Sequence, residues 1–407
     1  MKTQETVRDF YERLPYPPAV ADVGTHRDAY RDPIRRRALF HRMWPERMFE
    51  LGQKILIAGC GTAQGARYAL RYPDAQVTAI DISETSLRYT RHLQQTHSLA
   101  NLEIHRLAIE EVRELGSAFD MIVCTGVLHH LPDPDVGLRA LRDVLEPGGA
   151  LHLMVYARYG RAGIYMMQEY CRLLGIGTSP EDLQTLHAAL DMLPPDHALA
   201  RLLHHAKDFR EPEAMADALL HPLDRSYTVP ELHDWLGRCG FSFARWLEQA
   251  PYLPQCGIVA ASPHATRLAL LPMREQHAAV ELFRGTMVTH SLVAYRDDSP
   301  WAPQPIDFSG RRWHAFVPIA LPWTICIPDG VSPESVAVLI NRSHTCTDLL
   351  LRLDAFEHQL RGRINGARTI ADILEFAPRT AAGERRALRF FERLWRYDQI
   401  VFDASTT

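Results

Sequence analysis

A glycine-rich turn between an apolar strand and a helix constrains the fold of this 407-residue chain more than any other feature. The segment reads KILIAGCGTAQGA, in which an apolar run enters Gly59 and Gly61 and a helical pattern follows at once. Glycine lets the backbone turn sharply and approach a ligand closely at such a junction. Asp81 ends the next apolar run, twenty residues after Gly61, where a carboxylate can accept both hydroxyls of a ribose. The pattern predicts a nucleotide-binding unit, although a tight structural connection would also explain the glycines alone.

Apolar runs and amphipathic helical patterns alternate from Lys54 to Tyr156. The five apolar runs are KILIAG, VTAID, LEIHRLA, FDMIVCT and ALHLMVYA. Strands of this kind separated by helices argue for a parallel sheet that is covered on both faces. Right-handed crossovers then place the ligand crevice at the carboxyl ends of the strands. The expected fold class is therefore α/β, with a Rossmann-like, doubly wound sheet.

Changes in hydrophobic periodicity divide the chain into four regions. Residues 1–50 are expected to form an N-terminal helical cap, and residues 51–160 the Rossmann-like domain. Residues 161–260 indicate a helical cap or extension that returns to the sheet, and residues 261–407 a separate α+β domain. A chain ending near residue 262 would then keep every cofactor-binding residue proposed below and a core of its own.

Composition and charge disfavour several classes of partner. The formal net charge is −4, so no overall positive field exists to attract a nucleic-acid backbone or an anionic membrane. No apolar run reaches the roughly 18 residues that a membrane span needs. Seven cysteines show no CxxC pair and no metal-ligand spacing, so we expect free thiols and no metal. The N-terminus lacks the apolar core of a secretory signal, which favours a cytoplasmic location.

Three segments closely resemble the class I S-adenosylmethionine-dependent methyltransferases. They are the glycine turn, the segment AFDMIVCTGVLHHLPDP after the third predicted strand, and the segment EPGGALHLMVYA. The resemblance spans about Lys54 to Tyr156 and is specific in order and spacing. It implies an enzyme that uses S-adenosylmethionine and releases S-adenosylhomocysteine, whereas a strand, glycines and a carboxylate alone would also fit NAD or FAD.

The resemblance also implies which residues bind the cofactor. The glycines would face the methionine part, the carboxylate would hold the ribose, and the residues after the later strands would pack around the adenine and under the cofactor. The implied set is Gly59, Cys60, Gly61, Thr62, Asp81, Ile82, Ala108, Ile109, Cys124 and Thr125.

Three positions depart from the family pattern. Ala58 stands where an acidic residue usually helps to orient the methionine ammonium, and Ala63 replaces a common third glycine. A carboxylate is also absent at Ala108, which leaves backbone groups for the adenine edge.

Candidates for the reaction follow the fourth and fifth strands, where the acceptor usually approaches. They are His129, His130, Tyr156, Arg158 and Tyr159. An imidazole could take a proton from a hydroxyl or amine, and arginine could grip a carboxylate or phosphate. The alternative is structural: the histidines would form a turn with one ring bonded to the backbone, and the Tyr-Arg stretch would be a solvated loop.

Four further residues are candidates for a lid or for binding the acceptor. Tyr11 and Tyr16 lie in the N-terminal cap, which in methyltransferases often covers the cofactor. Arg161 follows the fifth strand, and Tyr227 lies in the loop LDRSYTVPEL. Core packing or anchoring of the helical insertion would explain these side chains equally well.

The C-terminal segment from about residue 349 loosely resembles the winged-helix-like modules that accompany peptide-modifying and oxygenase enzymes. The resemblance rests on FEHQLRGRINGARTIADILEFA and on ALRFFERLWRYDQIVFD. Peptide capture and homodimerisation are both open for such a module.

The predicted function is methyl transfer to an O, N or S nucleophile of a small metabolite or a peptide. The alternative is a non-catalytic S-adenosylmethionine- or nucleoside-binding regulatory or interaction protein, which the departures at Ala58 and Ala63 would favour.

Overall fold

The computed structural model describes the chain except for residues 1, 206, 302–305, 331–333, 377–379 and 406–407. It divides into two compact units. The first unit comprises residues 1–27, 52–241 and 284–291, and the second unit comprises residues 28–51, 242–283 and 292–407. This division differs from the four consecutive regions that the sequence predicts. The backbone explains part of the difference, because residues 284–291 return to the first unit, where Ala157 N donates to Val288 O and Gly160 N to Met287 O.

The first unit is built on parallel strands, as the apolar alternation predicts. They are β1 (Lys54–Ala58), β2 (Gln76–Asp81), β3 (Leu102–Arg106), β4 (Phe119–Thr125) and β5 (Leu145–Ala157). The parallel strands lie in the order β3-β2-β1-β4-β5, and the short β6 (Ser226–Tyr227) pairs with β5. The sheet order continues with β8 (Thr289–Arg296), which begins in the first unit and ends in the second, and with β7 (Phe241–Trp246), of which all but Phe241 belongs to the second unit. The order changes direction between β1 and β4, and this point of an open sheet is where ligands bind.

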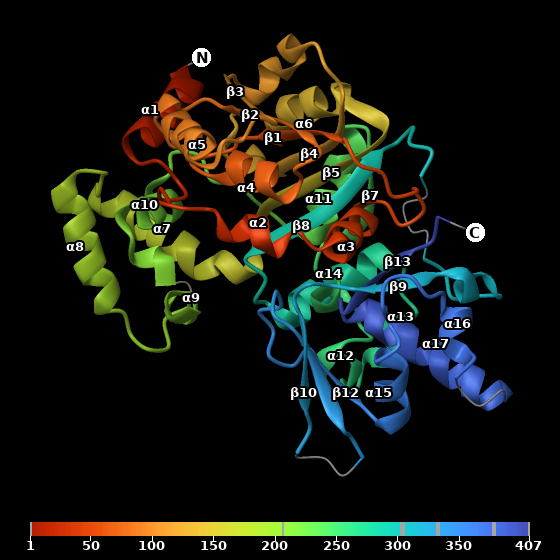
Figure 1. The fold of residues 1–407 in the computed structure, drawn as a ribbon. Helices are drawn as coiled ribbons and strands as arrows, with labels where there is room; N and C mark the ends of the chain where they lie inside the picture. The colour runs from red at the N-terminus through yellow and green to blue at the C-terminus, as the bar shows by residue number, and fades with distance from the viewer. Residues whose placement is uncertain (1, 206, 302–305, 331–333, 377–379, 406–407) are drawn as a thin grey trace. The chain divides into compact units, whose positions relative to one another are not determined.

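Helices cover the parallel strands, and side chains cap two of these helices. The helices are α4 (Gln64–Arg71), α5 (Glu84–His97), η1 (Ile109–Leu115), η2 (Leu128–His130) and α6 (Pro134–Asp143) (Figure 1). Ser83 Oγ caps α5, and the Asp133 carboxylate caps α6. Ile55, Leu56 and Ile57 of β1 are completely buried, as expected for a strand with a layer on each face.

A helical insertion follows β5 and ends before residue 242, where the second unit resumes. It contains η3 (Tyr159–Arg161), α7 (Ala162–Leu174), α8 (Pro180–Asp191), α9 (Ala200–His205), η4 (Lys207–Arg210), α10 (Pro212–Leu220) and α11 (Val229–Arg238). Its core contains Ile164, Leu186 and Met215, together with Phe10 from the N-terminal helix α1 (Lys2–Arg13). The N-terminal helix and the insertion therefore share one apolar core.

The second unit is α+β. Its strands are β9 (Val317–Ala320), β10 (Thr324–Pro328), β11 (Ala337–Asn341), β12 (Leu350–Leu353) and β13 (Ile400–Asp403). β10, β11 and β12 form an antiparallel sheet, and β13 pairs with β9. The helices are α3 (Pro33–Met43), η5 (Ala250–Tyr252), α12 (Gly257–Ala260), α13 (Ala265–Ala269), α14 (Met273–Arg284), η6 (Arg312–Ala315), α15 (Ala355–Arg361), α16 (Ile370–Leu374) and α17 (Ala381–Arg396), while the short α2 (Thr25–Ala29) lies where the two units divide. The likeness of this unit to a winged-helix module stays a prediction.

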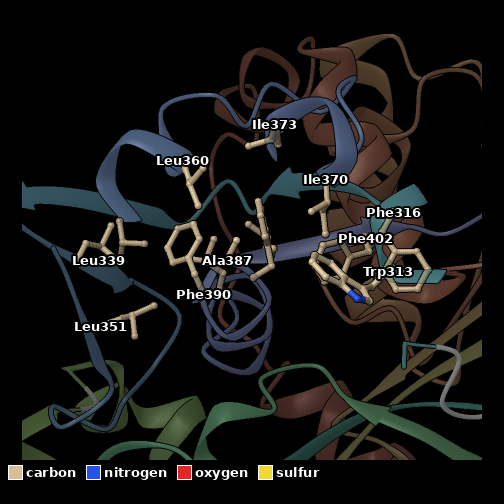
Figure 2. Close-up of a cluster of buried hydrophobic side chains, with 14 of the residues drawn as sticks. Trp313, Phe316, Leu339, Leu351, Leu360, Ile370, Ile373, Ala387, Phe390 and Phe402 are labelled. Carbon is tan, nitrogen blue, oxygen red and sulfur yellow. The ribbon is translucent and has the colours of Figure 1, made fainter. Parts of the chain in front are cut away.

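The second unit has an apolar core of its own (Figure 2). Leu339 and Leu351 of the antiparallel sheet face Phe390 of α17. Phe316, directly before β9, and Phe402 of β13 belong to the same core. All five side chains are at most 2% exposed, and each contributes roughly 1.5–3 kcal/mol by burial.

Candidate active site

A cavity of about 470 Å³ opens in the first unit at the carboxyl ends of the parallel strands. One part of its lining comes from the turns after the strands, and another part from α1, α7 and α10. The residues discussed below that line it are Tyr11, Tyr16, Gly59, Cys60, Gly61, Gln64, Asp81, Ile82, Ile109, Glu110, Thr125, Val127, His130, Tyr156, Arg161 and Asp217. The cavity therefore lies where the strand order predicts a ligand.

The glycine turn brings bare backbone to the cavity wall. Gly59 has φ +74°, and a Cβ atom there would lie 2.4 Å from Val127 Cγ2. Gly61 has φ +53°, and its Cβ would lie 3.1 Å from Tyr16 O and Pro17 Cδ. A larger side chain would need an unfavourable conformation and would also displace these neighbours. Both positions therefore require glycine for packing within the protein, and the approach of this backbone to a ligand stays a prediction.

Asp81 is half-buried and is held in one orientation by backbone amides. Gly61 N donates to Asp81 Oδ2 at 2.8 Å, and Ser83 N donates to Oδ1 at 2.9 Å. Burial raises the pKa of this carboxyl, and the amides of Ser83 and Gly61 act in the opposite direction. An ionised carboxylate has about four acceptor positions. The carboxylate therefore keeps acceptor capacity for a hydroxyl of a bound ribose.

Glu110 supplies an acidic side chain that the sequence analysis missed. It lies on the cavity wall two residues after Ala108, whose own side chain does not line the cavity. Ala108 instead occupies the N-cap position of η1. Burial raises the pKa of the Glu110 carboxyl. The acidic pair in IEEV was the signal in the sequence that could have indicated this residue.

Two tyrosines from distant segments donate hydrogen bonds to Asp217 of α10. Tyr11 Oη donates to Asp217 Oδ1 at 2.8 Å, and Tyr156 Oη donates to Oδ2 at 3.1 Å. Burial and the neighbouring Asp217 raise the pKa of both phenols, which therefore stay protonated donors. Burial also raises the pKa of Asp217 itself, against the opposing effects of His221 and the two phenols. The sequence reasoning found both tyrosines but missed Asp217, although an acid inside the apolar run AMADALL was a signal.

The two histidines after β4 differ in their surroundings. His130 lines the cavity, and its Nδ1 donates to Leu223 O at 2.6 Å, so one ring is bonded to the backbone as the structural alternative expects. Burial lowers the pKa of His130 to about 4. His129 lies behind the wall with its ring 3.9 Å from that of Tyr156, and burial, His130 and Arg161 hold its pKa well below the usual value. Both rings are neutral at pH 7.

Arg161 supports the wall from a buried ion pair. Its Nη2 lies 3.0 Å from Asp224 Oδ2, and both side chains are less than a tenth exposed. Its guanidinium carbon lies 3.4 Å from the centre of the Tyr156 ring. Gln168 Nε2 also donates to Asp224 at 2.6 Å. Arg161 therefore packs Tyr156 in place as well as lining the cavity.

Several predicted residues do not line the cavity. They are Thr62, Ala108, Cys124, His129, Arg158, Tyr159 and Tyr227. Arg158 pairs with Glu231 at 3.0 Å in an exposed position, and Tyr227 stacks on Trp235 at 4.8 Å. These contacts explain why the loop after β5 and the Tyr227 loop have structural roles.

The remaining predicted residues are brought together. Gly59, Cys60, Gly61, Asp81, Ile82, Ile109 and Thr125 line the cavity with Tyr11, Tyr16, His130, Tyr156 and Arg161. Gln64, which the sequence analysis did not select, donates from Nε2 to Thr125 Oγ1 at 2.8 Å and lines the same wall.

Residues 56–151 match the sequence-family model described as a methyltransferase domain. An uncharacterised protein of a Synechococcus strain is 33% identical over 241 residues, which cover 57% of this chain and 58% of that protein. A ubiquinone biosynthesis O-methyltransferase of Chromobacterium violaceum is 35% identical over 116 residues, which cover 27% of this chain and 47% of the enzyme. The chain thus spans about half the length of these relatives.

The solved structure of PKMT2 from Rickettsia typhi in complex with AdoHcy has the same fold over most of the chain. The TM-score is 0.61 at 15% sequence identity, and the match covers 95% of this chain and 77% of that one.

In the described part of the chain, no helix is long and apolar enough to cross a membrane. Among the same residues, no group of three or more His, Cys, Asp or Glu side chains is placed to hold a metal ion. The cytoplasmic location and the homodimer stay predictions.

Proposed function

We propose that this chain, whose residues 56–151 match a methyltransferase domain, is a class I enzyme that transfers the methyl group of S-adenosylmethionine to an oxygen or nitrogen nucleophile. One observation carries the proposal. A single cavity is lined both by the glycine turn with Asp81 and by the Tyr11–Asp217–Tyr156 cluster. The first set suits a nucleoside cofactor and the second suits a polar acceptor.

The residues of the first set fit S-adenosylmethionine. The glycine turn lines the cavity as bare backbone, with Val127 packed where a Cβ atom of Gly59 would lie, and the Asp81 carboxylate can accept from ribose hydroxyls. Ile82 and Ile109 offer apolar side chains to the adenine, and Glu110 could accept from its amino group. When bound, the sulfonium supplies an electrophilic methyl group with a good leaving group.

The second set favours an acceptor that can donate a hydrogen bond. Both phenols donate their hydrogen bonds to Asp217. The remaining acceptor positions of this carboxylate can therefore accept from an N–H or O–H group. A thiolate or carboxylate nucleophile would instead meet a like charge in a buried site. The geometry therefore supports an amine or hydroxyl rather than a sulfur nucleophile.

Positioning and desolvation account for most of the catalysis that these residues can provide. Holding the nucleophile against the methyl donor replaces a bimolecular encounter with an oriented one. Asp217 is also placed to take the proton of the acceptor, because its raised pKa brings it closer to neutral pH. His130, with a pKa of about 4, is a hydrogen-bond acceptor more than a proton store.

The size of the cavity limits what part of the acceptor enters. About 470 Å³ lies in the range of roughly 300–1,000 Å³ that holds one drug-sized ligand. A nucleoside cofactor fills much of this space. The acceptor is therefore a small metabolite, or a peptide of which a single side chain enters the cavity.

Methyl-labelled S-adenosylmethionine tests the proposal. The full chain is incubated with matched panels of amines, alcohols and thiols and with a lysine-, serine- and cysteine-containing peptide set. We expect label to enter an amine or an alcohol, and Asp217→Asn to lower kcat at least tenfold with little change in cofactor affinity.

Two results would contradict the proposal. Methyl transfer to thiols alone would contradict the inference that Asp217 selects an amine or a hydroxyl. Tight cofactor binding without transfer to any class of acceptor would instead support the non-catalytic nucleoside-binding protein.

A further inference from the structure

The second unit encloses a smaller cavity that the proposed reaction does not use. Its volume is about 220 Å³, and residues of β7, α14 and the end of α17 line it. This volume is below the roughly 300–1,000 Å³ of pockets for drug-sized ligands. A ligand here would be a small molecule.

The charged residues that line this cavity are arginines, and the carboxylates of Asp398 and Glu248 act on Arg245 from outside the lining. Arg245 and Arg396 line the cavity, and none of its described lining residues is an aspartate or glutamate. Arg396 is paired with Glu392 by a hydrogen bond of 2.6 Å. Arg245 therefore carries most of the preference for an anion.

Arg245 is buried and only partly neutralised. Its side chain is 11% exposed, Nε donates to Trp246 O at 3.1 Å, and Nη2 reaches Asp398 Oδ1 only at 3.5 Å. Asp398 also accepts from Ala250 N at 2.9 Å and contacts His344 Nε2 at 3.0 Å. Within the described chain, Nη1 of Arg245 has no hydrogen-bond partner. Guanidinium donors in this state suit a carboxylate, which accepts two parallel bonds.

Aromatic side chains make the other walls rigid and apolar. Trp246 stacks on Tyr252 at 3.9 Å with 9° between the rings, and the Phe243 ring lies 4.9 Å away. Trp246 Nε1 donates to His277 Nδ1 at 3.0 Å, which fixes the indole. Such walls suit the hydrocarbon part of a ligand rather than a fully polar ion.

We propose that this cavity binds a small organic carboxylate, with Arg245 holding the carboxylate and the aromatic residues around Trp246 holding the hydrocarbon part. The inference is independent of the methyl-transfer reaction. It assigns a second ligand site to the unit that carries no cofactor-binding residue.

Binding of benzoate and of 3-methylbutanoate to the full chain tests the proposal. Calorimetry measures affinity, and tryptophan fluorescence reports on Trp246 and Trp395, which both line the cavity. We expect at least one carboxylate to bind with a submillimolar Kd. Benzamide, the neutral counterpart of benzoate, and inorganic phosphate should bind at least tenfold more weakly.

Three variants locate the site. Arg245→Gln should weaken carboxylate binding at least tenfold. Met273→Trp should also weaken binding at least tenfold, because the indole fills the cavity while the guanidinium stays in place. If circular dichroism shows that Arg245→Gln is unfolded, Met273→Trp alone tests whether the carboxylate binds in this cavity. Arg311→Gln, at an exposed position outside the cavity, should keep the affinity within twofold.

The proposal is overturned by any of four results. These are no binding of either carboxylate, equal binding of benzamide, equal binding of inorganic phosphate, or unchanged binding by a folded Met273→Trp variant.

Discussion

At the residue scale, Asp81 is the strongest test of the cofactor site. Asp81→Ala removes the acceptor for the ribose and should weaken S-adenosylmethionine binding by about 1–3 kcal/mol, as for other charge-assisted hydrogen bonds. Isothermal titration calorimetry measures this change. Asp81→Asn is the control, because its carbonyl can still accept one amide bond from Gly61 or Ser83. Unchanged affinity in folded Asp81→Ala would show that the carboxylate is only structural.

Gly59 tests steric fit at the same scale, with Gly116 as a matched control. Both glycines have positive φ, 74° and 59°, so alanine strains the backbone at either position. A Cβ at Gly59 would lie 2.4 Å from Val127 Cγ2, whereas a Cβ at Gly116 would have no atom within 4 Å. Gly59→Ala should lower affinity for S-adenosylhomocysteine at least tenfold, and Gly116→Ala should leave it within twofold. Equal affinities in the two variants would show that the glycine turn does not bind the cofactor.

At the element scale, the N-terminal helix α1 is attached to α5 by Glu12. The carboxylate accepts from Glu84 N at 2.7 Å, from Thr85 N at 3.0 Å and from Thr85 Oγ1 at 2.6 Å. These bonds satisfy free amides at the start of a helix and place a negative charge at its positive end. Glu12 therefore helps to hold Tyr11 at the cavity.

The attachment predicts a pH dependence. Burial opposes ionisation of Glu12, but the bonds from Thr85 and Glu84 outweigh it and lower the pKa. A lowered pKa gives stability that is present above the unfolded-state pKa and is lost as the pH falls through the folded-state pKa. Glu12→Gln should therefore lower Tm at pH 7, and the gap from the parent protein should shrink toward pH 3. A gap that stays constant over this range would contradict the role of the charge.

At the scale of the whole molecule, the two units are not consecutive in the chain. Residues 284–291 belong to the first unit, and Val288 and Thr289 line its cavity. A chain that ends at residue 262 lacks this segment and its backbone bonds to Ala157 and Gly160. Contrary to the expectation from the sequence, we now predict that this shortened chain loses S-adenosylmethionine binding. Circular dichroism and calorimetry check this together, and a folded chain with unchanged affinity would restore the simpler division.

The sequence by itself determined the sheet and the cofactor side of the site. A glycine turn, the strand before it and Asp81 lie within thirty residues, and local periodicity and turn chemistry are enough to predict their arrangement. Five further candidates, chosen because they lie near predicted strand ends or in a predicted cap, also line the cavity, and their roles stay predictions. They are Tyr11, Tyr16, His130, Tyr156 and Arg161.

Only the tertiary structure decided the acceptor side. The bond from Tyr11 to Asp217 joins residues 206 positions apart, and the bond from Tyr156 joins residues 61 apart. The acid inside AMADALL marks Asp217 as unusual, but no local pattern specifies which face of α10 turns inward or which side chains it meets. Tyr227 was selected from its loop, whereas its ring stacks on Trp235 and does not line the cavity. The return of residues 284–291 to the first unit could not be predicted for the same reason. The pairing of distant segments depends on the burial of the whole chain, and a short stretch of sequence carries no information about that burial.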